Sequence, residues 1–93
     1  MIQSSGKIEA TGVVSEVPCK LWGFLWTADA DKKPTVTLRD HASAASGTIV
    51  GFAAAADAAT ATVMLPAPVR CFNGIHATFS AAEGDLVVYY EVM

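Results

Sequence analysis

The segment Cys19-Lys-Leu-Trp-Gly-Phe-Leu-Trp-Thr27 is the most apolar run of the chain. Aromatic and aliphatic residues favour β-strands, in which successive side chains point to opposite faces. A regular strand would place Trp22, Phe24 and Trp26 on one face and the two leucines on the other. Both faces would then be apolar, whereas a strand of a two-layer sandwich buries only one face. We therefore expect this strand to be covered on both sides, by a loop, a neighbouring sheet or another subunit.

The run Leu86-Val-Val-Tyr-Tyr-Glu-Val92 has a similar two-faced pattern, with Tyr89 on its second face. Tryptophan and tyrosine exposed on a sheet are typical of protein interfaces. The sequence therefore gives four candidate residues for an oligomer or partner interface: Trp22, Phe24, Trp26 and Tyr89. The alternative is that these rings fill the core, as most large apolar side chains do.

Outward from this segment, short β-prone runs alternate with turn residues such as Asn73-Gly74. The turn signals recur every 8–12 residues or so, which is typical of all-β domains. We predict a compact antiparallel β-sandwich, jelly-roll-like, with about seven or eight strands. The alanine-rich stretch 53–59 is predicted to be the tip of a hairpin, with a short helical turn as the alternative. The expected strands are 7–14, 19–27, 35–39, 48–53, 60–65, 69–72, 75–80 and 86–92.

A chain of 93 residues has room for a single domain, residues 1–93, with residues 1–6 predicted as a flexible or partner-binding arm. Six basic and nine acidic residues give a net charge of -3, which disfavours a nucleic-acid partner. No signal peptide is expected at the N-terminus. The stretch 48–65 contains Asp57 and lacks a leucine-rich run, so no membrane span is expected.

Residues that could carry chemistry are scattered or confined to one loop. Cys19 and Cys71 are expected to be free thiols, although a disulfide between them is geometrically possible. There is no Cys-x-x-Cys or His-x-x-x-His spacing, so no metal site is predicted. Asp40-His41 lies near two serines but without the Gly-x-Ser-x-Gly elbow of a hydrolase, and solvated loop residues are the preferred interpretation. We therefore predict no catalytic residue and no cofactor.

Three segments resemble a known family in their chain order. Thr35-Val-Thr-Leu-Arg-Asp-His-Ala-Ser-Ala-Ala-Ser-Gly-Thr-Ile-Val50 resembles a strand, an R/Y-D-G-x-S-x-x-G loop and a second strand, with His41 where the pattern has glycine. Residues 65–80 resemble a proline-hydrophobic segment followed by phenylalanine and an Asn-Gly turn. Residues 83–91 resemble a closing Gly-Asp strand that carries tyrosine. The order is similar to that of small β-sandwich proteins of tailed bacteriophages, which serve as capsid decoration (cement) or minor virion proteins.

This resemblance implies a non-enzymatic protein of the virion that is assembled in the host cytoplasm in many copies, often as trimers. Its partners would be other copies of itself and the major capsid protein, without nucleic acid or membrane. The resemblance supplies no catalytic residues. An alternative remains open, because aromatic side chains on a β-sandwich can stack on sugar rings. The chain would then be a carbohydrate- or receptor-binding module of a head or tail fibre.

Overall fold

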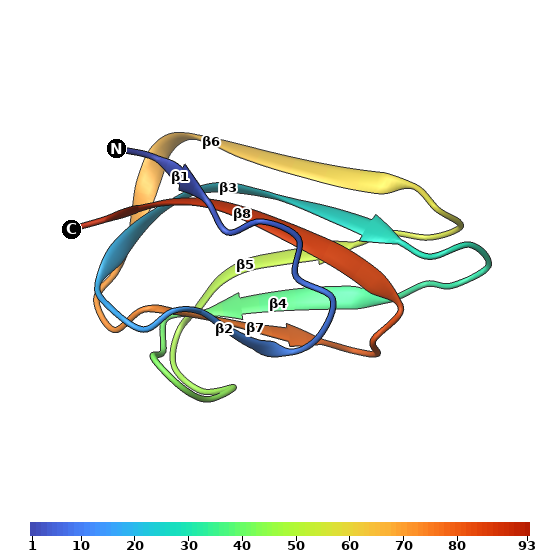
Figure 1. The fold of residues 1–93 in the computed structure, drawn as a ribbon, viewed down its shortest axis with the longest axis horizontal. Helices are drawn as coiled ribbons and strands as arrows, with labels where there is room; N and C mark the ends of the chain where they lie inside the picture. The colour runs from blue at the N-terminus through green and yellow to red at the C-terminus, as the bar shows by residue number, and fades with distance from the viewer.

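The computed structural model describes residues 1–93 and contains eight β-strands in two antiparallel sheets (Figure 1). The predicted all-β sandwich is therefore confirmed. No helix is present, and so none is long and apolar enough to cross a membrane. The strands are β1 (Gln3–Ser4), β2 (Gly12–Ser15), β3 (Cys19–Ala28), β4 (Thr35–Arg39), β5 (Ile49–Ala54), β6 (Thr60–Cys71), β7 (Ile75–Phe79) and β8 (Gly84–Val92).

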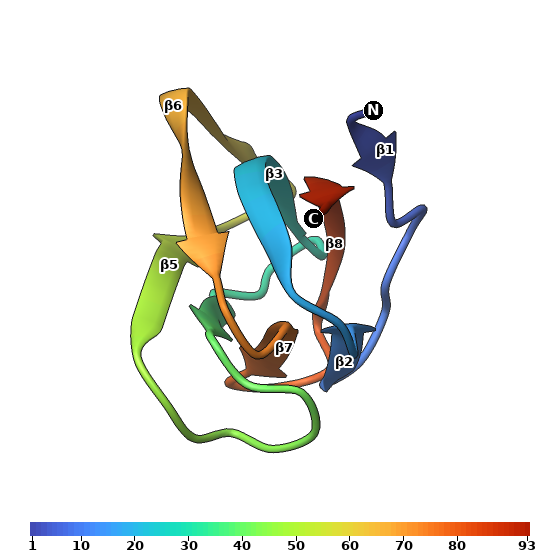
Figure 2. The same ribbon diagram turned by 90° about the vertical axis from the view of Figure 1, so that its left-hand side faces the viewer.

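The strand order follows a jelly-roll pattern. One sheet has the order β1-β8-β3-β6 and the other β2-β7-β4-β5. Only β4 and β5 are consecutive neighbours in one sheet, and every other connection passes from one sheet to the other. This double Greek-key order is that of eight-stranded jelly rolls. Figure 2 shows the edge strands β5 and β6 on the same side of the sandwich.

The core lies between the sheets and is built around β3. Phe24 and Trp26 are 1 % and 0 % exposed, and the indole of Trp26 packs edge-to-face against Phe79 with ring centroids 4.6 Å apart. The Trp26 Nε1–H donates a hydrogen bond of 3.1 Å to the Pro34 carbonyl oxygen. This bond satisfies the one polar atom of a fully buried ring.

The predicted faces of β3 are wrong because the strand carries a β-bulge. Leu21 pairs with Tyr90 of β8, and Gly23 pairs with Tyr89, so Trp22 is the extra residue. Such a residue shifts the alternation of side chains by one position. Leu21 therefore points inward before the bulge and Phe24 points inward after it. Trp22 lies on the outer face, opposite to Phe24 and Trp26.

Strand β6 was expected as two strands separated by Pro66-Ala-Pro68, and it is one edge strand. Its ladder with β3 is interrupted between Val69 and Met64, where four residues lie opposite the single Trp22. Proline lacks an N–H group and is tolerated at such an edge. The alanine-rich segment before β6 is not a hairpin tip, because it links β5 to β6 across the two sheets. It turns at Asp57 and Ala58, which both have positive φ.

The N-terminal segment forms two short strands instead of the single strand predicted for residues 7–14. Gln3–Ser4 pairs with Tyr89–Tyr90, so part of the predicted arm lies against β8. Ile8 forms an isolated bridge to Leu86, and Gly12–Ser15 then joins the other sheet beside β7. Both ends of the chain lie at one end of the sandwich (Figure 1).

Candidate interaction surface

An apolar strip crosses the outer face of the β1-β8-β3-β6 sheet. Tyr89, Gly23 and Met64 form one row across β8, β3 and β6, and Val87 and Leu25 form the neighbouring row. Residues paired directly across antiparallel strands share a face and contact each other. Together with Trp22 at the bulge, these side chains make up the outer strip, which we define as Trp22, Leu25, Met64, Val87 and Tyr89.

Gly23 keeps the middle of the strip flat. A Cβ atom at this position would lie 2.8 Å from the Sδ atom of Met64 and 2.5 Å from the Val63 carbonyl oxygen. The glycine therefore leaves room for the thioether of Met64, whose side chain is 59 % exposed. Methionine is flexible and polarizable, and it adapts readily to an apposed surface.

The Trp22 end of the strip has a polar border. The indole Nε1–H of Trp22 donates a 3.4 Å hydrogen bond to Oε1 of Glu91, and the Met1 amino group contacts Oε2 of Glu91 at 2.8 Å. The Met1 amino group and then the Trp22 indole lower the pKa of the Glu91 carboxyl. Lys20 pairs with Glu91 across the ladder. An apolar centre with a charged border is the usual anatomy of a protein interface.

The structure divides the four predicted interface residues between two environments. Trp22 and Tyr89 are half-buried on the outer strip, whereas Phe24 and Trp26 are core residues without surface access. Leu25 of β3 and Val87 of β8 also lie on the strip. Sequence reasoning missed Met64, because the pairing of β6 with β3 cannot be read from local pattern. The alternation Thr60-Ala-Thr-Val-Met64 was the only signal.

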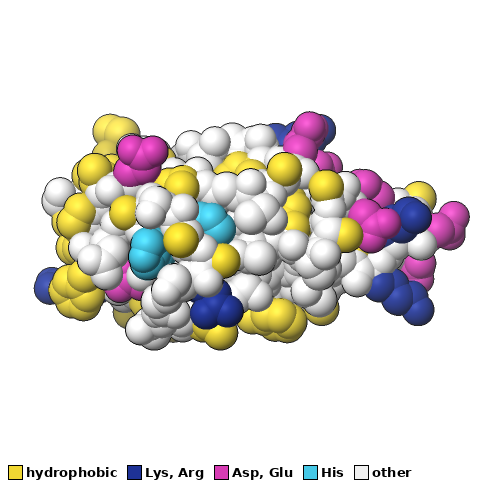
Figure 3. Space-filling model, turned by 90° about the horizontal axis from the view of Figure 1, so that it is seen from below, with side chains coloured by type: hydrophobic (Ala, Val, Ile, Leu, Met, Phe, Trp, Pro, Cys, Tyr) yellow, Lys and Arg dark blue, Asp and Glu magenta, His cyan; other side chains and the backbone are white.

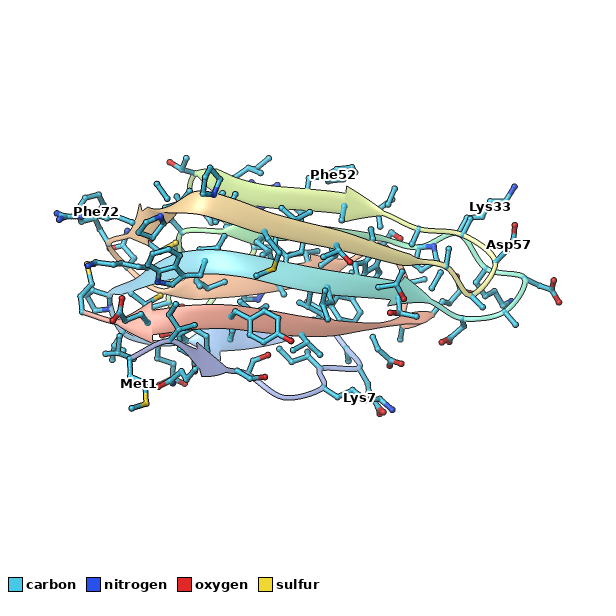
Figure 4. All side chains as sticks on the ribbon, turned by 90° about the horizontal axis from the view of Figure 1, so that it is seen from above. Met1, Lys7, Lys33, Phe52, Asp57 and Phe72 are labelled. Carbon is cyan, nitrogen blue, oxygen red and sulfur yellow. The ribbon has the colours of Figure 1, made fainter.

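The two ends of the long axis differ in their side chains. On the side of the β2-β7-β4-β5 sheet, shown in Figure 3, a cluster of charged groups lies at one end, and hydrophobic side chains lie among a few charged ones at the other. Figure 4 shows Lys33 and Asp57 at the charged end and Phe72 at the opposite end. Phe72 is 64 % exposed, and Val17 and Val92 are also exposed. Because Cys71 and Val92 both pair with Cys19, the exposed Phe72 and Val92 lie at the same end of this sheet.

The loop considered for hydrolase chemistry has a structural role. Both carboxylate oxygens of Asp40 accept backbone N–H bonds, from Phe72 at 3.1 Å and from Asn73 at 2.8 Å. Nδ1 of His41 accepts backbone N–H bonds from Ser43 and Ala44, each 3.0 Å long. The predicted turn at Asn73-Gly74 is present, with Gly74 at φ 133°, and it forms the connection between the sheets that Asp40 holds. The Asp40 carboxylate thus holds its loop against the β6–β7 connection, and the His41 ring stabilises the turn that follows it.

The candidate site is a surface and not a cavity, since no pocket opens on the molecule. No group of three or more His, Cys, Asp or Glu side chains is arranged to hold a metal ion. No protein-family model, curated protein or solved structure matches this chain.

Proposed function

We propose that this chain is a non-enzymatic virion structural protein of a tailed bacteriophage, a capsid decoration protein that binds the capsid surface as a homo-oligomer. The trimer is the state implied by the family resemblance of residues 35–50, 65–80 and 83–91. Its partners in this proposal are other copies of the chain and the major capsid protein. The jelly-roll strand order supports the proposal, because viral capsid domains are among the proteins that use it.

The outer strip is the observation that carries this proposal. A sheet in a self-sufficient sandwich usually shows polar side chains to water on its outer face. Here the central strands β3 and β8 place Trp22, Leu25, Val87 and Tyr89 there, next to Met64 of the edge strand. Covering the strip by another protein surface would remove these side chains from water, which stabilises association.

A second function, glycan or receptor binding, has one specific observation in its favour. Trp22 and Tyr89 lie on the same face, and the Glu91 carboxylate is beside the indole. Aromatic rings with a neighbouring hydrogen-bond acceptor suit the apolar face and hydroxyl groups of a sugar. This second function predicts that Trp22 fluorescence responds to a glycan.

The test is quantitative mass spectrometry of purified phage particles produced by the strain that encodes the chain. A decoration protein should occur in a fixed, high ratio to the major capsid protein and should be removed when the outer surface is stripped by mild denaturant. Absence from particles, or a few copies confined to the tail, would contradict the proposal. A glycan panel measured by tryptophan fluorescence would then test the second function, with Trp22→Ala as the silent control.

A further inference from the structure

Cys19 and Cys71 lie directly opposite each other in the antiparallel ladder between β3 and β6. Cys19 begins β3, Cys71 ends β6, and both are free thiols. Both side chains are fully buried in the core cluster, so they share the inner face. Directly opposite residues of an antiparallel pair have Cα atoms about 4.5–5.5 Å apart, within the range of about 4.4–6.8 Å that a disulfide spans.

We propose that Cys19 and Cys71 form a reversible cross-strand disulfide when the chain meets a small-molecule disulfide such as oxidised glutathione. The thiolate of one cysteine attacks the glutathione disulfide and releases one reduced glutathione. The other cysteine then displaces the second glutathione from the mixed disulfide. The protein loses two protons and two electrons, and these convert oxidised glutathione into two thiols, so the exchange balances.

The bond would join an edge strand of this sheet to the central strand β3. β6 is an edge strand whose ladder with β3 is interrupted over residues 65–68. Beyond that interruption, only Val69, Arg70 and Cys71 pair with β3 before the chain leaves for the exposed Phe72. A disulfide at this point would hold the short distal ladder and close the loop from residue 19 to residue 71. It would therefore restrict the unfolded chain more than the folded one.

Exchange in the folded protein should be slow. Burial raises the pKa of Cys71 to about 12 and also raises the pKa of Cys19. Only the thiolate attacks a disulfide, and neither sulfur reaches solvent. We therefore expect oxidation to need an opening of this end of the sheet, and to be much faster during refolding. This inference does not depend on the proposed virion function.

The test compares the full chain refolded from denaturant with and without a mixture of oxidised and reduced glutathione. The expected product is a monomeric chain that has lost the mass of two hydrogen atoms, with the Cys19 and Cys71 peptides joined. Its Tm should exceed that of the reduced protein by about 10 °C or more. The single variants Cys19→Ala and Cys71→Ala should take up one glutathione each instead.

Several results would overturn the proposal. The wild-type chain could remain a dithiol, carry two glutathione adducts, or form disulfides only between chains. The oxidised form could also have a Tm below that of the reduced form. These readouts come from the wild-type protein, so they hold even where a single variant fails to fold.

Discussion

At the scale of single residues, the two tryptophans of β3 have opposite roles although they are four positions apart. Trp26 is fully buried and bonded to Pro34, whereas Trp22 is half-buried and bonded to Glu91. A regular alternation would have given them the same environment. Because the bulge at Trp22 shifts the alternation of side chains, Trp22 lies on the outer face and Trp26 lies in the core.

Substitution of the two tryptophans should therefore have unequal effects on stability. Trp26→Phe removes the hydrogen bond to Pro34 and leaves space beside Phe79, so the free energy of unfolding should fall by about 2 kcal/mol. Trp22→Phe, the matched control, should change the free energy of unfolding by less than about 1 kcal/mol. Urea denaturation of both variants checks this. Equal losses would contradict the assignment of Trp26 to the core and Trp22 to the surface.

His76 makes the stability depend on pH. Burial, and secondarily the nearby His41 and Arg39, lowers the pKa of His76 below its ordinary value of 6.5. The unfolded chain therefore binds more protons just below that pH, and stability is lost as the pH falls from about 6.5 through the lower pKa of the folded state. The loss should be smaller in His76→Gln.

Two measurements check the role of His76. Urea denaturation between about pH 5 and 7.5 compares wild type with the variant over the range in which an ordinary histidine titrates. Titration of the ring by NMR in the folded wild type gives the pKa itself. A His76 ring that titrates at or above 6.5 would show the account of this residue to be wrong.

At the scale of elements, local pattern predicts strands well where a strand has one buried face. Thr35–Arg39 alternates between threonine or arginine and an aliphatic residue, and it matches β4 residue for residue. The bulge of β3 and the continuity of β6 through Pro66 and Pro68 were missed. Both depend on how neighbouring strands pair, and a single strand carries no information about its partners.

Gly23 should be one of the least replaceable residues of the sheet. An added methyl group would meet the backbone of β6 at Val63, so Gly23→Ala must separate β3 from β6 or strain the bulge. We expect a loss of about 1–3 kcal/mol in the free energy of unfolding. Gly12→Ala in β2 is the matched control, because a Cβ atom there meets nothing within 4 Å. Indistinguishable urea midpoints for the two variants would refute the close approach at Gly23.

At the scale of the whole molecule, the sequence predicts a jelly-roll-like sandwich, but it does not say which strands are neighbours. Turn spacing and apolar runs identify the strands, while the jelly-roll order depends on contacts between distant segments such as β1 with β8. Of the candidate site, Trp22 and Tyr89 were among the candidates because apolar residues on both faces of a strand exceed what one small core can bury. The other two candidates, Phe24 and Trp26, complete that core.

The apolar composition of this small chain then has a physical explanation. The core takes up one set of side chains, and the outer strip presents a second set on the opposite face of the same sheet. The charged side chains at the β3–β4 and β5–β6 loops lie at one end of a 38 Å long axis (Figure 4), and Lys20 and Glu91 border the strip toward the other end. The domain folds around its own core, and in the proposed function neighbouring subunits cover its outer strip.

The measurement that tests this account most directly is the mass of the protein in solution, determined by light scattering at micromolar concentration. We predict a multiple of the 9.7 kDa chain for wild type and for Thr37→Glu, a control on the outer face of the other sheet. Leu25→Glu, which places a charge in the centre of the outer strip, should give a folded monomer. A wild-type protein that remains a 9.7 kDa monomer, or a Leu25→Glu variant that assembles as wild type does, would contradict association through the outer strip.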